Sequence, residues 1–288
     1  MENLWIFYSL GWLITLGMWD YIKKLILSKG INKEVFLLVC FTFYVPVFWI
    51  NMLINGTGNI DPYTLKNGII FWLSNTLAPV FVLISLKYLD TAFSLVSIRV
   101  LSSFFVLFIG TQIIWDQLSI IDYIWFFLWV SAVFLLSWFE FGKKYDLHRK
   151  WIVWTIIAMA GIIFWHSYFK HIVPNINVHD FMPIQFTTTF FGILFYVVIR
   201  WKLKDINKKE MVLSLPYAWM TVVVFALYFL YFLPNIYLNG TLSLGYKMLS
   251  YSLIVPIALS IIFLWDSLTK KRIIAFILTI ISIFLFIL

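Results

Sequence analysis

Charged residues are scarce in this sequence. Of its 288 residues, 12% are charged and 63% are hydrophobic, and the mean hydropathy is +0.95. A soluble domain carries about 25% charged residues, so a water-soluble fold cannot cover this much apolar surface, whereas a lipid bilayer solvates it. The scarcity of charge therefore excludes an ordinary soluble protein and indicates an integral membrane protein.

Cysteine and the common catalytic motifs are lacking as well. The single cysteine, Cys40, permits no intrachain disulfide and no cysteine metal cluster, and we expect a small buried side chain. The chain has no His-Glu-x-x-His, no Gly-x-Ser-x-Gly and no glycine-rich phosphate loop. We therefore expect no enzymatic activity, metal or cofactor, and we interpret the pair His179-Asp180 as a solvated turn.

Long apolar runs dominate what is present. Most are close to the roughly 20 residues that a helix needs to cross a bilayer, and they lack the alternation of a membrane β-barrel. No basic segment precedes the first run, so we expect it to be retained and not cleaved. Pro174 and Pro234 are expected to end helices. The ten predicted helices are 4–22, 35–54, 68–88, 91–114, 120–139, 151–172, 184–201, 211–233, 241–265 and 272–288.

The basic residues are sorted by side. The segments after the first, third, fifth, seventh and ninth runs hold 17 of the 21 lysines and arginines, and the other side holds only Lys66 and Lys170. The positive-inside rule places these 17 in the cytoplasm and both termini outside. The net charge of +8 is therefore interpreted as a signal for orientation, and we expect no nucleic-acid partner.

Two sequence echoes indicate an internal repeat. Residues 114–119 read Ile-Trp-Asp-Gln-Leu-Ser, and 264–269 read Leu-Trp-Asp-Ser-Leu-Thr, at an offset of 150. At an offset of 146, Trp5, Trp19 and Lys24 match Trp151, Trp165 and Lys170. Five crossings is an odd number, so two such halves must be inverted in the membrane. We predict an all-α integral membrane fold of ten transmembrane helices, in two inverted five-helix repeats at 1–142 and 143–288.

This pattern resembles the drug/metabolite transporter superfamily, in particular its EamA-like members. The resemblance covers nearly the whole chain and rests on five plus five helices with an acidic turn after the fourth and the ninth. Members commonly carry Glu-Arg at those turns, where this chain has Asp116-Gln117 and Asp266-Ser267. The resemblance implies a small-molecule transporter in which helices 4 and 9 help to line a central cavity. It also implies cytoplasmic termini, contrary to the distribution of basic residues.

Arg99 and Lys247 are charges placed about eight residues into the fourth and ninth predicted helices. A charge at that depth usually faces a cavity or a partner, so both are candidates to bind an anionic substrate. The alternative is that the long side chains reach back to the interface. Asp116 and Asp266 are expected to organise the two turns by accepting hydrogen bonds from helix N-termini.

Asp20 and His166 occupy matching places in the first and sixth predicted helices. Either could bind substrate or take up a proton, since histidine titrates near neutral pH; the alternative is an interfacial anchor. Four aromatic side chains could stack on a flat substrate or serve only in packing: Trp12, Trp72, Tyr196 and Trp219.

We interpret the chain as a gradient-driven transporter of a small organic solute that works by alternating access, since it holds no ATP-hydrolysing domain. The expected partners are the solute, the bilayer of the cell membrane and a coupling proton or ion, with the chain a monomer or homodimer. Two alternatives stay open: an intramembrane enzyme acting on a lipid or lipid-linked sugar, and a non-transporting accessory subunit.

Overall fold

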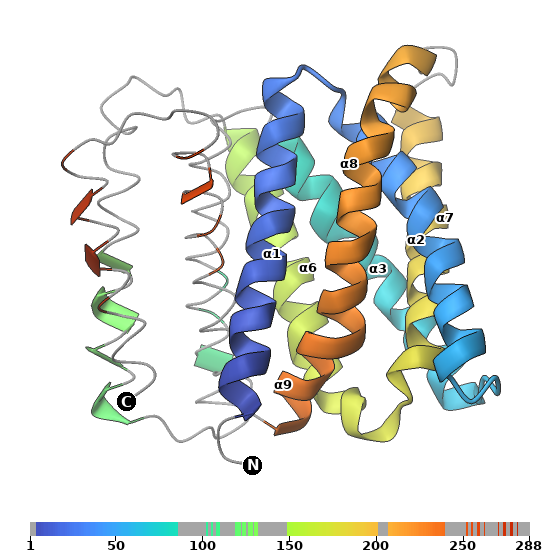
Figure 1. The fold of residues 1–288 in the computed structure, drawn as a ribbon, viewed down its shortest axis with the longest axis horizontal. Helices are drawn as coiled ribbons and strands as arrows, with labels where there is room; N and C mark the ends of the chain where they lie inside the picture. Colours follow the sequence, from blue (N-terminus) through green and yellow to red (C-terminus); the bar gives the residue numbers. More distant parts are fainter. Residues whose placement is uncertain are drawn as a thin grey trace.

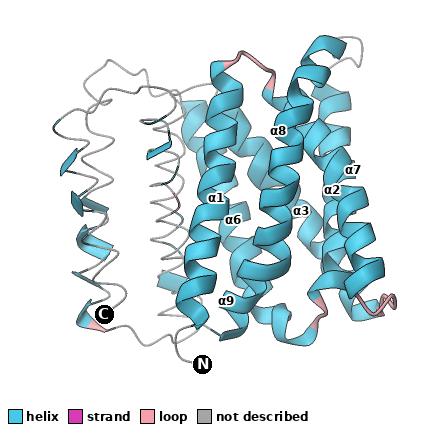
Figure 2. Cartoon of the chain, viewed as in Figure 1, coloured by secondary structure: helices cyan, strands magenta, loops and turns pink. Residues whose placement is uncertain are grey.

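A computed structural model describes residues 4–85, 149–200 and 207–239, together with single residues between 102 and 131 and between 252 and 281. The described residues form helices and short connections and contain no strand (Figure 2). The helices stand side by side as one bundle, with their axes roughly aligned (Figure 1). This confirms the all-α part of the sequence prediction.

The helices have the lengths that a bilayer requires. Helices of 20–25 residues span about 30–37 Å at 1.5 Å per residue, which matches a hydrocarbon core of about 30 Å. Within the described residues, four stretches are long and apolar enough to cross a membrane: Lys33–Asn55, Val153–Asn175, Val178–Ile199 and Lys208–Leu238. These stretches indicate a multi-pass membrane protein. In chain order the elements are α1 (Leu4–Ser28), α2 (Lys33–Asn55), α3 (Pro62–Ser85), α6 (Arg149–Ile172), η1 (Val173–Asn175, 3₁₀), α7 (Val178–Arg200), α8 (Lys208–Leu227), η3 (Tyr228–Phe232, a π-turn) and α9 (Leu233–Asn239).

The helix starts follow local sequence signals. Asn32 caps α2 by accepting from the Glu34 backbone N–H at 3.0 Å, and Asn207 caps α8 through Lys209 at 2.9 Å. Asp61 caps α3, where its carboxylate accepts from the backbone N–H of Thr64 at 2.9 Å and from its hydroxyl at 2.6 Å. Each cap satisfies a backbone donor that the first helical turn leaves open.

The predicted helix end at Pro234 is wrong. The helix passes from α8 through η3 into α9 and reaches Asn239. Proline lacks a backbone N–H and cannot bond the carbonyl four residues earlier. The Leu233 N–H instead reaches five residues back to the Tyr228 carbonyl, so the chain absorbs the proline in a π-turn and stays helical.

The interpretation of His179-Asp180 as a solvated turn is also wrong. Asp180 lies in the first turn of α7 and is 2% exposed. Its carboxylate accepts from the Thr57 backbone N–H at 3.0 Å and from the Thr57 hydroxyl at 2.6 Å. His179 faces α2, and its Nδ1 atom lies 3.0 Å from the Nδ2 atom of Asn51. The pair therefore fastens the α2–α3 connection to α7.

The helices pack in a regular pattern of neighbours. Helix α3 packs on α6 and α1 packs on α8; α2 and α7 pack on each other; and α3 contacts α7 while α2 contacts α8. This pattern is unchanged when α1, α2 and α3 are exchanged with α6, α7 and α8. Glycine allows one of the close approaches, since a Cβ at Gly161 of α6 would lie 3.3 Å from the Ser74 carbonyl of α3.

The described helices place their basic residues at one end of the bundle. Helices α1, α3 and α7 run one way and α2, α6 and α8 run the other (Figure 1). The residues at the shared end, here called the basic end, are Lys23, Lys24, Lys29, Lys33, Arg149, Lys150, Arg200, Lys208 and Lys209. Among the basic residues of α1–α3 and α6–α8, only Lys66 and Lys170 lie toward the opposite end. The side of the membrane that the basic end faces stays a prediction.

Candidate functional site

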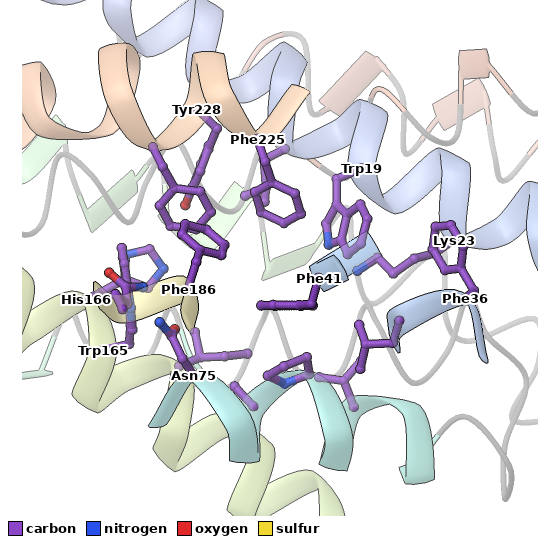
Figure 3. A pocket seen from close by; sticks show the side chains of 18 of the residues that line it. Trp19, Lys23, Phe36, Phe41, Asn75, Trp165, His166, Phe186, Phe225 and Tyr228 are labelled. Atoms are coloured by element: carbon purple, nitrogen blue, oxygen red, sulfur yellow. The ribbon is translucent and has the colours of Figure 1, made fainter. Parts of the chain in front are cut away.

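A cavity of about 180 Å³ lies between the helices. Side chains from α1, α2, α3, α6, α7, α8 and η3 line it, so it lies where the two groups of helices meet. Aromatic side chains form much of its wall (Figure 3). The aromatic lining residues are Trp19, Phe36, Phe41, Trp165, Phe186, Phe225, Tyr228 and Phe229.

These rings hold one another in place. Trp19 meets Phe225 edge-on, with ring centroids 4.6 Å apart, and stacks against Phe36 at 6.1 Å. Phe186 of α7 stacks on Phe48 of α2 at 4.2 Å and touches Phe229 edge-on at 5.2 Å. Edge-on and offset contacts of this kind are the favoured arrangements of aromatic pairs. The wall is therefore a packed aromatic framework that can present flat surfaces to a solute.

The predicted repeat pair Trp19 and Trp165 lines this one cavity. Both indoles are buried, with 8% and 5% of the residue exposed, one on α1 and the other on α6. The sequence matched them by an offset of 146 residues alone. The structure thus brings two residues that the echo paired in sequence to a shared site.

One part of the cavity is polar. Asn75, His166 and Gln185 line it, and Figure 3 shows Asn75 and His166 near one another and away from Lys23. His166 is buried, and its Nδ1 lies 2.6 Å from the Tyr237 hydroxyl. The Lys170 ammonium donates to the Tyr237 carbonyl. His166 is therefore held in a fixed orientation by α9 while it faces the cavity.

Two buried polar groups of the lining have no hydrogen-bond partner among the described residues. Gln185 is 0% exposed, and both its amide oxygen and its amide nitrogen lack a partner. The Trp165 indole N–H lacks one too. Leaving a buried polar group unpaired costs about 1–3 kcal/mol, and such groups are uncommon in folded proteins. Their position at the cavity makes both groups available to a molecule that enters it.

Lysines line the other part of the cavity, toward the basic end. Lys23 pairs with the buried carboxylate of Asp20 at 2.5 Å, and its ammonium stands 5.1 Å from the centre of the Trp19 ring. Lys33, the first residue of α2, lines the cavity as well. Asp20 itself does not line the cavity, but its charge balances that of Lys23 there.

A cluster of buried aromatic rings lies beyond the polar part, toward the opposite end. Phe71 contacts Trp165 at 5.7 Å, Phe181 at 5.3 Å and Phe169 at 6.2 Å between ring centroids. Phe71, Phe169 and Phe181 are each 0% exposed. This cluster is here called the aromatic plug, and its members lie on α3, α6 and α7 between the polar lining residues and the end of the bundle opposite the basic end.

The π-turn η3 lies at the cavity wall and was not predicted from the sequence. It contains Tyr228 and Phe229, which line the cavity, and the wider turn rotates the residues after it relative to a regular α-helix. Such turns often occur at functional sites. The sequence signal for this π-turn was Pro234. It lies six residues after Tyr228, in a run that otherwise continues as a helix.

The structure places the remaining predicted site residues elsewhere. Trp12 is fully buried behind the cavity and contacts the rings of His166 and Tyr237 at about 6 Å. Trp72 is 41% exposed, Trp219 is 52% exposed and Tyr196 is half-buried, and none of the three lines the cavity. The predicted residues Arg99, Lys247, Asp116 and Asp266 lie outside the described residues.

The sequence prediction of site residues missed Gln185. The signal was present, because a glutamine inside an apolar helical run has no favourable interaction with lipid and must face protein, water or a ligand. In the described part of the chain, no group of three or more histidine, cysteine or acidic side chains is placed to hold a metal ion.

Comparison with known proteins shows a shared fold. Twenty-eight chains of solved structures match the structure of this chain. One, described only as "Crystal structure of protein", has a TM-score of 0.71 and 11% sequence identity, and the match covers 96% of this chain and 97% of that one. At this identity the similarity shows the fold alone. No known protein family matches the sequence, and no curated protein does.

Proposed function

We propose that this protein is a gradient-driven membrane transporter of a small organic solute, working by alternating access between two inverted five-helix halves, 1–142 and 143–288. The observation that carries the proposal is the cavity between α1–α3 and α6–α8, with a buried amide that lacks a partner among the described residues. A scaffold has no use for such a group, because filling the space with apolar side chains would stabilise the fold.

The packing of the helices supports the inverted repeat. The pattern of neighbours is unchanged when α1, α2 and α3 are exchanged with α6, α7 and α8. Corresponding helices run in opposite directions, as in α1 and α6 (Figure 1). Trp19 and Trp165, matched by the sequence echo, lie on the wall of the same cavity. These features are those expected of a transporter with inverted repeats and a central site, and they favour the proposed likeness to EamA-like transporters.

The two ends of the cavity support alternating access. Lysines line it toward the basic end, and the buried rings of the aromatic plug lie toward the other end. A solute held between them would cross if the two groups of helices rock so that the plug opens and the basic end closes. His166, buried and in contact with the cavity, is the candidate site for a coupling proton.

An uptake screen in proteoliposomes tests the proposal. The purified protein is expected to carry at least one solute of a broad metabolite panel down a gradient. Leu37, which is 4% exposed and lines the cavity, gives the blocking variant Leu37→Trp. The matched control Leu213→Trp alters a side chain on α8 that is 50% exposed. Uptake should be lost in the first and kept in the second, with both checked for folding by thermal denaturation.

Absence of uptake for every solute, in folded protein of either orientation, would contradict the proposal. Equal uptake by Leu37→Trp and the unaltered protein would show that the solute does not pass through this cavity. Ala78→Val, a smaller change at another lining residue, serves as a second blocking variant if Leu37→Trp does not fold.

A further inference from the structure

The buried amide of Gln185 defines the chemistry of a ligand. A primary amide offers a donor and an acceptor side by side, and neither Gln185 atom has a partner among the described residues. The Trp165 indole N–H adds a second donor on the same cavity wall. The group that completes this set presents one acceptor and one donor, as the carbonyl oxygen and the N–H of an amide do.

The rest of the wall calls for a flat apolar body. Trp19, Phe41, Phe186 and Phe225 present rings to the cavity. The volume of about 180 Å³ is slightly larger than the roughly 150 Å³ cavity that holds a benzene ring. It is smaller than the roughly 300–1,000 Å³ of sites for drug-sized ligands. The space therefore fits one aromatic ring with a small substituent.

The hydrogen-bonding set also discriminates against a carboxylate. A carboxylate only accepts hydrogen bonds, so it would leave the Gln185 oxygen without a donor and would bring an unbalanced charge into an aromatic cavity. Lys23, one of the two lysines of the lining, is already paired with Asp20. A neutral amide satisfies both atoms of Gln185 without burying a charge.

We infer that the cavity binds a small uncharged aromatic ring bearing an amide group, which pairs with Gln185 and Trp165 while the ring lies among the aromatic side chains. This names the solute class of the proposed transporter, and it rests on that function for its biological meaning. Binding itself can be measured without transport.

Calorimetric titration of the purified full-length protein with three matched probes tests the inference. Benzamide carries ring and amide, toluene carries the ring alone, and benzoate replaces the amide with a charged group that only accepts. Benzamide should bind about tenfold or more tightly than either of the others, since one lost hydrogen bond of this kind corresponds to about that factor.

Variants assign the binding to the named groups. Gln185→Leu should weaken benzamide binding about tenfold and leave toluene binding unchanged or stronger. Trp165→Phe should weaken benzamide binding, whereas Trp154→Phe should not. Trp154 is a matched control because it lies on the same helix, its indole N–H also has no partner among the described residues, and it does not line the cavity.

Three results would overturn the inference. Equal affinity for benzamide and toluene would show an aromatic cavity without amide recognition. Unchanged benzamide binding in Gln185→Leu would remove Gln185 from the site. Binding of no probe would mean that water alone completes the Gln185 bonds. In each case the uptake screen still decides the transporter proposal separately, since it uses a panel that is not restricted to amides.

Discussion

At the scale of the residue, the cavity combines side chains that stabilise the fold with groups that weaken it. The stacked and edge-on rings around Phe186 bury large apolar surfaces. Gln185, the residue before it, adds a buried amide without a described partner. A residue that costs stability and lines a cavity is the pattern expected where function opposes stability.

Replacing that amide should stabilise the protein. In Gln185→Leu, an apolar side chain of similar size fills the space without an unpaired polar group, so the ligand-free protein should gain about 1–3 kcal/mol. Thermal denaturation in detergent is expected to show a higher Tm. Gln185→Glu keeps the size but buries a charge and should lower the Tm. A lower Tm for Gln185→Leu would mean that the amide is already satisfied in the folded protein.

Asp180 is expected to act in the opposite direction. Its carboxylate accepts from the Thr57 backbone N–H and hydroxyl, and it is almost fully buried. Asp180→Ala leaves these donors unpaired and should lower the free energy of unfolding by about 1–3 kcal/mol. Thr57→Val removes only the hydroxyl and should cost less. Equal Tm values for Asp180→Ala and the unaltered protein would show that the contact does not hold the α2–α3 connection to α7.

The sequence revealed some of these residues and not others. His166 and Trp165 stood out, one as a titratable group in an apolar run and the other through its match with Trp19, and both line the cavity. Trp72 and Trp219 looked equally suitable as stacking residues, yet both are substantially exposed. An apolar helix in lipid has hydrophobic residues on every side, so its sequence does not show which face is turned inward.

At the scale of the element, helix positions could be predicted better than helix ends. The runs predicted at 35–54 and 151–172 agree closely with α2 and α6. The run predicted from 68 begins at Pro62, because Asp61-Pro62 is a strong start signal that hydropathy does not register. The end predicted at Pro234 was wrong because the π-turn rearranges the backbone hydrogen bonds before the proline and lets the helix continue.

The Asp61 cap gives α3 a pH dependence. Hydrogen bonds from the Thr64 hydroxyl and backbone N–H hold the pKa of the Asp61 carboxyl below its ordinary value. Because the folded pKa is the lower one, the contribution of the cap is fully present above the unfolded value of about 4. It is lost as the pH falls through the folded pKa.

Asp61→Ala should therefore lower the Tm at neutral pH, because the first turn of α3 loses its cap. The difference in Tm between this variant and the unaltered protein should shrink as the pH falls below about 4 and the native carboxylate becomes protonated. Asp61→Asn, which keeps a capping oxygen, is the control and should stay close to the unaltered protein at neutral pH. A Tm difference that does not change over this range would contradict an ionised cap.

At the scale of the whole molecule, the helices place basic residues at one end and thereby predict an orientation. The charge rule puts the basic end in the cytoplasm and both termini outside, whereas the resemblance to EamA-like transporters implies the reverse. Reporter fusions at residue 288 decide between them. We expect activity from a reporter that works only outside the cytoplasm, and an active cytoplasmic reporter there would show that the charge rule fails for this chain.

The central claim is that one cavity opens to each side of the membrane in turn. The protein is well suited to a cysteine test, because its only cysteine, Cys40, is buried and Cys40→Ala gives a background free of thiols. In that background, Asn75→Cys places a thiol on the cavity wall. Ala158→Cys, at a fully buried position that does not line the cavity, is the control.

The deciding measurement is the labelling of Asn75→Cys by a small membrane-impermeant thiol reagent, applied separately to each side of oriented membrane vesicles. Alternating access predicts labelling from both sides and no labelling of Ala158→Cys from either. Labelling of Asn75→Cys from one side only, under every gradient and solute tested, would contradict the account and would favour a one-sided site such as that of an intramembrane enzyme.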